Sequence, residues 1–128
     1  MTISTQTPEK PRRFVILRHV DREGTHFDLM IEYKDVLWTW KFSEWPDGVG
    51  EKSHIGQRIA DHRPIYLEYE GPISGDRGMV TRVDWGDCII EQESHDGYLV
   101  RFSGTIFTGR FSLTPAASQS WALRRLEA

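Results

Sequence analysis

The chain has 128 residues, enough for one domain with an ordinary hydrophobic core and too few for two independent domains. Hydrophobic residues make up 38% and charged residues 27%, proportions typical of folded globular proteins and not of disordered ones. The net charge of -3 argues against a protein that wraps duplex DNA through a broad basic surface. The single cysteine, Cys88, excludes an internal disulfide and a cysteine-based zinc cluster, so any metal would be bound by His, Asp or Glu.

The first residues are polar and contain no apolar stretch that resembles a signal peptide. No window of the sequence approaches the length needed to span a bilayer. We therefore expect a cytoplasmic protein without a membrane partner, in which residues 1–12 form an N-terminal extension and residues 13–128 form a single domain.

Short runs of alternating polar and apolar residues follow one another along the chain, separated by turn residues. The expected strands are residues 14–18, 26–33, 36–42, 65–69, 79–85, 89–93, 98–102, 107–113 and 121–126. This pattern predicts a mainly β fold, a small closed or partly open β-barrel of about eight short strands with few or no helices.

Turn residues predict the connections between these strands. Tight turns are expected at residues 34–35, 86–87 and 95–97, and longer loops at residues 46–50 and 72–78. Residues 57–61 are compatible with a helical turn, although their composition does not decide the matter.

The segment His26-Phe27-Asp28-Leu29-Met30-Ile31-Glu32-Tyr33 alternates strictly between polar and apolar residues. Side chains in a strand alternate between the two faces, so His26 and Asp28 share one face, about 7 Å apart along the strand. His19, at the end of the preceding strand, can complete a set of three metal ligands. Two imidazoles and one carboxylate suit manganese, iron or zinc and leave coordination positions open for a substrate. The alternative is a solvent-facing strand in which the His and Asp are incidental.

A basic cluster between Lys52 and Arg63 includes two further candidates, Arg58 and His62. A histidine beside a phosphate can donate a proton to a leaving oxygen, and the hydroxyl of Tyr66 can hold a nonbridging oxygen. Pro64 favours extended backbone between His62 and Tyr66. Arg58 can grip a phosphate through its guanidinium. The alternative is a solvated loop with a packed tyrosine and a surface histidine.

The aromatic residues are expected to have different roles. Trp38, Trp40 and Phe42 alternate along one strand, which predicts packing in the interior. Trp45 follows in a loop, where it can stack on a nucleobase or cap the end of the core. Cys88 has no basic partner nearby in the sequence, which gives little support to a nucleophilic role.

These segments, in this order, resemble the 3'-phosphoesterase domain of bacterial and archaeal DNA ligase D. The matching segments are T-P-E at residues 7–9, R-F-V-I-L-R-H at 13–19, H-F-D-L-M-I-E at 26–32, D-H-R-P-I-Y-L-E-Y-E-G at 61–71, and the glycine-spaced residues 104–111 followed by Trp121. Together they cover nearly the whole chain and are more specific than any one of them.

The resemblance implies a manganese-dependent phosphoesterase on a small β-barrel, which trims ribonucleotides and 3'-phosphates from DNA ends during end joining. It assigns the metal to His19, His26 and Asp28, although zinc or iron would also suit these ligands. Contacts to the scissile phosphate fall to His62, supported by Tyr66 and Arg58, and an accessory acidic role falls to Glu9. The partner implied is a nucleic-acid 3' end, DNA or DNA with a terminal ribonucleotide, together with a separate ligase or polymerase.

Three departures from the family pattern affect the phosphate contacts. Met30 stands where the family has an arginine, Leu17 stands where it has a glutamine, and the family's lysine has no match after Trp40. These departures leave open a catalytically silent barrel that binds nucleic-acid ends or a protein. The histidines and the aspartate also leave open an iron oxygenase with a two-histidine, one-carboxylate triad, which the short chain makes less suitable.

Overall fold

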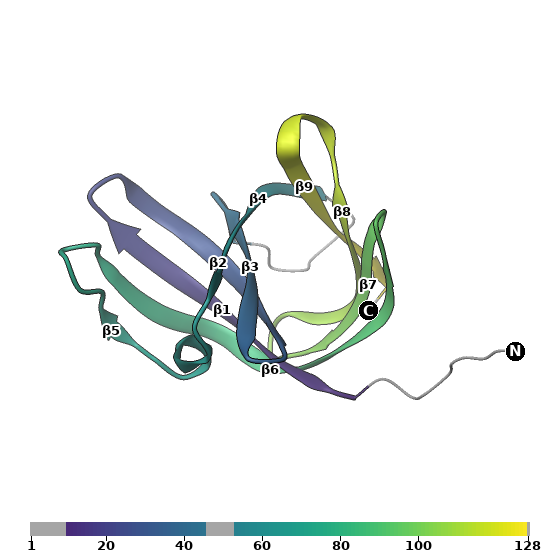
Figure 1. Ribbon diagram of the computed structural model, residues 1–128, viewed down its shortest axis with the longest axis horizontal. Coiled ribbons are helices and arrows are strands. Elements are labelled where there is room, and N and C mark those ends of the chain that lie inside the picture. The colour runs from purple at the N-terminus through teal and green to yellow at the C-terminus, as the bar shows by residue number, and fades with distance from the viewer. Residues whose placement is uncertain (1–9, 46–52, 128) are drawn as a thin grey trace, which may run out of the picture.

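The computed structural model of the protein describes residues 10–45 and 53–127 (Figure 1). Its strands are β1 (Arg12–Asp21), β2 (Gly24–Tyr33), β3 (Val36–Phe42), β4 (Ser53–His62), β5 (Gly71–Pro72), β6 (Met79–Ser94), β7 (Gly97–Ser103), β8 (Thr108–Pro115) and β9 (Ser120–Glu127). Two short 3-10 helices, η1 (Pro64–Leu67) and η2 (Ala117–Gln119), complete the secondary structure. None of the helical segments in these residues is long and apolar enough to cross a membrane.

The strands form one antiparallel sheet that closes on itself. Its order is β1-β2-β3-β4-β9-β8-β7-β6-β5, and β1 also pairs with β6, which closes a ring of eight strands and leaves the two-residue β5 at its edge. Figure 1 shows β2, β3 and β4 on one side of the ring and β7 and β8 on the other. The predicted mainly β fold of about eight short strands with few or no helices is confirmed.

Residues 79–94 form one long strand, β6, where two strands with a turn at residues 86–87 were predicted. The first part of β6 pairs with β1 and the second part with β7, so a single strand serves two neighbours. A Cβ atom at Gly86 would lie 2.3 Å from the carbonyl oxygen of Ser103. The glycine therefore permits close packing within a strand and does not mark a turn.

The structure differs from the predicted elements in two further places between residues 53 and 69. Residues 53–62, which were not among the predicted strands and of which 57–61 were compatible with a helical turn, form β4, which pairs with β3 and in part with β9. Residues 65–69, expected as a strand, begin within η1, whose first helical position is Pro64. In η1 the side chain of Leu67 is buried and Ile65 is 60% exposed, so the apolar alternation there reflects one buried anchor on a turn.

Buried side chains cover both faces of β1, β2 and β3. The main core fills the interior of the ring with aromatic and aliphatic residues from seven of the strands and from Phe107. An outer cluster packs beneath η1 on the outside of the ring and consists of Val15, Leu17, Met30, Leu37, Leu67 and Val80. The face of β2 that carries His26 and Asp28 is therefore covered for part of its length, because Met30 is buried in the outer cluster.

Candidate metal centre

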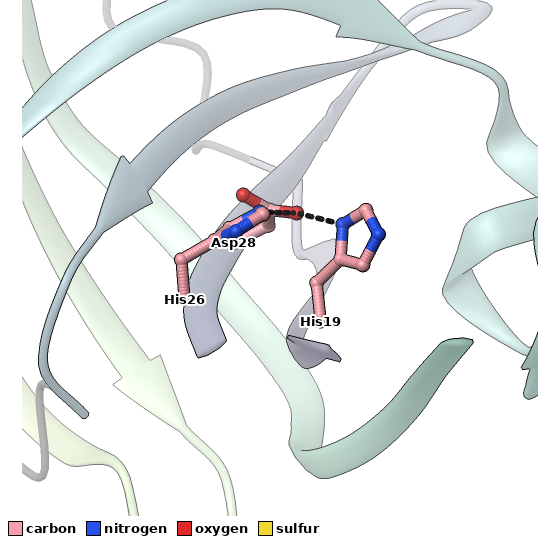
Figure 2. A group of neighbouring side chains, drawn as sticks. All are labelled: His19, His26 and Asp28. Carbon is pink, nitrogen blue, oxygen red and sulfur yellow. Dashed lines mark ion pairs between the residues drawn. The ribbon is translucent and has the colours of Figure 1, made fainter. Parts of the chain in front are cut away.

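His19, His26 and Asp28 converge on the outer face of the β1–β2 hairpin (Figure 2). His19 and His26 are direct cross-strand partners, and Asp28 follows His26 by two residues on β2. Cross-strand partners project from the same face of a sheet, and so do residues two apart in a strand. The hairpin alone thus places all three side chains together.

The distances between the three side chains suit one small cation. Nδ1 of His19 lies 3.9 Å from Oδ2 of Asp28, and Nε2 of His26 lies 3.3 Å from the same oxygen. One ligand atom from each residue lies within 4.8 Å of the other two. Two atoms that are each about 2.1 Å from a common ion lie at most about 4.2 Å apart, so small side-chain adjustments complete the coordination.

Asp28 is a buried carboxylate with incomplete hydrogen bonding. The residue is 3% exposed, and its Oδ1 atom has no hydrogen-bond partner among the described residues. The flanking side chains of His19 and His26 are also mostly buried, at 17% and 14% exposure. A buried carboxylate is costly unless it is paired or coordinates a metal, so this donor set fits a divalent ion.

A main-chain group orients one of the candidate ligands. Nε2 of His19 lies 2.7 Å from the carbonyl oxygen of Arg77. A carbonyl oxygen can only accept, so Nε2 carries the proton and, in the neutral ring, Nδ1 keeps its lone pair on the side of Asp28. Metal-binding histidines commonly have their second nitrogen fixed in this way.

A pocket of about 270 Å³ opens beside the triad and contains two of the other predicted site residues. His62, at the end of β4, and Tyr66, in η1, contact each other with ring centroids 5.7 Å apart. Nδ1 of His62 lies 2.9 Å from the carbonyl oxygen of Ala60, so Nδ1 donates and Nε2 is the nitrogen available for proton transfer. The structure therefore brings His62 and Tyr66 to the same pocket as His19 and Asp28.

Leu17 and Met30 also line this pocket. Both belong to the outer cluster, at 0% and 1% exposure. The two positions where the resembled family has a polar phosphate contact are therefore part of an apolar floor.

Arg58 does not line this pocket, so the geometry gives no support to its predicted role as a clamp on the phosphate. Its cross-strand partner is Trp40, which faces the interior of the ring. The guanidinium carbon lies 4.9 Å from the ring centroids of Trp38 and Trp40 and 5.9 Å from that of Trp121. Nη1 also donates to the Tyr98 hydroxyl at 3.3 Å. Arg58 is thus held by aromatic packing on the opposite face of the sheet.

Two other expectations concern residues away from the triad. Trp45 packs against Phe27 and Phe107, with ring centroids 5.8 and 6.4 Å apart, and so caps the main core. Glu9 lies outside the described residues.

Three cations that the sequence did not single out lie near the triad. Arg63 and Arg77 line the 270 Å³ pocket. Lys41 is the cross-strand partner of Asp28 and lines a second hollow, of about 420 Å³, which includes His26. Lys41 was detectable from the hairpin register, and Arg63 belonged to the basic cluster. Nothing in the local sequence distinguishes Arg77.

No model of a protein family and no curated protein matched this chain. The resemblance to the ligase D phosphoesterase domain therefore remains a prediction from its motifs.

Proposed function

We propose that the protein is a metal-dependent phosphoesterase that acts on nucleic-acid 3' ends, removing a 3'-phosphate or a 3'-ribonucleotide in DNA repair by end joining. The observation that carries the proposal is the convergence of His19, His26 and Asp28, two of which, His19 and Asp28, line a pocket that also contains His62. Two imidazoles and one carboxylate suit manganese, and also zinc or iron.

The triad would hold the divalent ion, which supplies charge neutralisation and polarisation of a phosphoryl oxygen when bound. The hydrogen bond at Nδ1 of His62 leaves Nε2 available, and the doubly protonated ring can give its Nε2 proton to the leaving oxygen. The Tyr66 hydroxyl is a hydrogen-bond donor in the pocket, and Arg63, which also lines it, is suited to supply the positive charge that Arg58 does not.

The proposed partner is a nucleic-acid 3' end in the cytoplasm. A separate ligase or polymerase would then act on the processed end. A second candidate function is a catalytically silent module that binds such ends or a protein. The apolar floor formed by Leu17 and Met30 favours this candidate, since it removes two polar contacts from the pocket.

The test combines metal analysis with turnover. Metal-free protein would be supplied with Mn²⁺ and assayed on 5'-labelled primers that end in a 3'-phosphate or in one ribonucleotide. We expect Mn²⁺-dependent release of the terminal group, lost in Asp28→Asn and in His62→Gln. His95→Ala is the matched control, because His95 is exposed in the turn between β6 and β7.

Each other outcome contradicts the proposal in a defined way. Metal binding and primer binding without release would favour the silent module. Bound iron with oxygen uptake would indicate the oxygenase, and the absence of metal binding would exclude both enzymes.

A further inference from the structure

We infer that residues 73–78 form a supporting loop for the metal centre and that Arg77 is a positioning residue, whose main-chain carbonyl fixes the His19 imidazole in the metal-binding tautomer. The inference rests on the proposed function for the identity of the centre. It adds the element that organises the centre before any metal arrives.

A hydrogen bond joins the loop to the candidate metal ligand His19. At 2.7 Å, the contact from Nε2 of His19 to the Arg77 carbonyl lies at the short end of the normal range for N–H···O bonds. It joins residues 58 apart in sequence. The tautomer of His19 is therefore set by tertiary structure and not by its own hairpin.

Hydrogen bonds within the loop hold this carbonyl in place. The Ile73 amide donates to the Gly78 carbonyl at 2.8 Å, and the Arg77 amide donates to the Ile73 carbonyl at 3.4 Å. The Arg77 side chain folds back, with Nε donating to the Ser74 carbonyl at 2.7 Å and Nη2 contacting the Ser74 hydroxyl at 3.2 Å. Main chain and side chain together hold the Arg77 peptide in one place.

The loop also packs directly on β1, the strand that carries His19. Gly78 has φ +98°, and a Cβ atom there would lie 2.2 Å from the Val20 carbonyl oxygen and 2.9 Å from Cβ of Asp21. Both the backbone conformation and the space require glycine. An ion pair between Asp76 and Arg22 further ties the loop to the β1–β2 turn.

These contacts mean that His19 presents Nδ1 toward Asp28 in the metal-free protein. The loop bears no metal ligand in the proposed set, yet displacing it would free the His19 ring to rotate or change tautomer. Loss of such supporting hydrogen bonds typically weakens metal binding about 10–100-fold.

The direct test is ¹⁵N NMR of the imidazoles in the metal-free wild-type protein, at a pH where they are neutral. We expect His19 to show a protonated Nε2 and an unprotonated Nδ1. Finding the proton on Nδ1, or an even mixture of the two forms, would overturn the inference whether or not the protein proves to be a phosphoesterase.

The second test moves the loop. Gly78→Ala should weaken Mn²⁺ binding about 10–100-fold in calorimetric titration and convert the His19 spectrum to a mixture of tautomers. Gly97→Ala is the matched control, because Gly97 also has positive φ, at +115°, and its Cβ would lie 2.5 Å from the Leu113 carbonyl oxygen in a distant turn. It should lose comparable stability and keep both the affinity and the tautomer.

A folded Gly78→Ala variant that binds Mn²⁺ within about twofold of wild type would refute the role of the loop. If the variant does not fold, the wild-type imidazole spectrum alone decides. Failure of the wild-type protein to bind Mn²⁺ would instead refute the proposed function, so the two failures are distinguishable.

Discussion

Replacing Arg58 with alanine separates the packing role that the structure gives this residue from the phosphate contact that the sequence suggested. The guanidinium carbon lies within 6 Å of three indole rings and its Nη1 atom contacts a tyrosine hydroxyl. The truncation would remove these contacts on the inner face of the sheet and leave the pocket on the outer face intact.

The expected loss of stability follows from the three cation–π contacts. Each is worth about 0.5–1 kcal/mol when exposed and about 2 kcal/mol when desolvated. For a partly buried arginine we expect a decrease of about 2–4 kcal/mol in the free energy of unfolding, including the lost packing of the side-chain stem. With an unfolding entropy of about 2.1 cal/mol/K per residue, a chain of 128 residues would lose about 7–15 °C in Tm.

The assay is urea denaturation followed by tryptophan fluorescence, which reports on the indoles around Arg58. Arg63→Ala is the complementary control, because Arg63 is an exposed residue that lines the candidate site. It should leave stability nearly unchanged and weaken binding of a 3'-phosphorylated primer. Unchanged stability of Arg58→Ala combined with lost phosphate release would refute the placement of Arg58.

Three further predictions concern groups outside the candidate site. Asp84→Asn should destabilise the fold by about 3 kcal/mol in urea denaturation. The buried Asp84 carboxylate accepts hydrogen bonds from four backbone N–H groups, whereas the amide of asparagine offers only one oxygen. An unchanged denaturation midpoint would contradict this prediction. Burial of Glu91 opposes its charge, but hydrogen bonds from Arg110 and Arg101 outweigh burial and lower its pKa. Glu91→Gln should therefore reduce the free energy of unfolding at pH values above the ordinary pKa of 4.5. The difference from wild type should vanish as the pH falls through the lowered pKa of the folded state. Burial raises the pKa of Cys88 to about 12, so a thiol reagent at neutral pH should modify it only after denaturation, and rapid reaction of the native protein would show that the thiol is accessible.

The sequence predicted best the strands whose two faces differ in polarity. In β2 and β3 the main-core side chains alternate with others, and hairpin turns limit both strands, so alternation was sufficient to define them. It failed in β4, where Gly56 replaces an inward side chain against the Phe42 ring and Arg58 faces the aromatic interior. A cation on an inner face reverses the expected pattern, and only the tertiary arrangement reveals it.

The same distinction explains which parts of the candidate site were predictable. His19 and His26 are equally far from the centre of one hairpin, and Asp28 lies two residues further on, so local geometry brings the triad together. The support from Arg77 depends on a loop distant in sequence, and the burial of Met30 depends on η1 covering the outer face of β2. Neither could be predicted from alternation, because both are long-range contacts.

The most direct measurement is the stoichiometry of Mn²⁺ binding by equilibrium dialysis of the purified chain beside its His26→Ala and His95→Ala variants. We expect one ion bound per chain in the wild type and in His95→Ala, and none in His26→Ala. Absence of binding by the wild type, or equal binding by all three proteins, would contradict the metal centre on which the proposed chemistry depends.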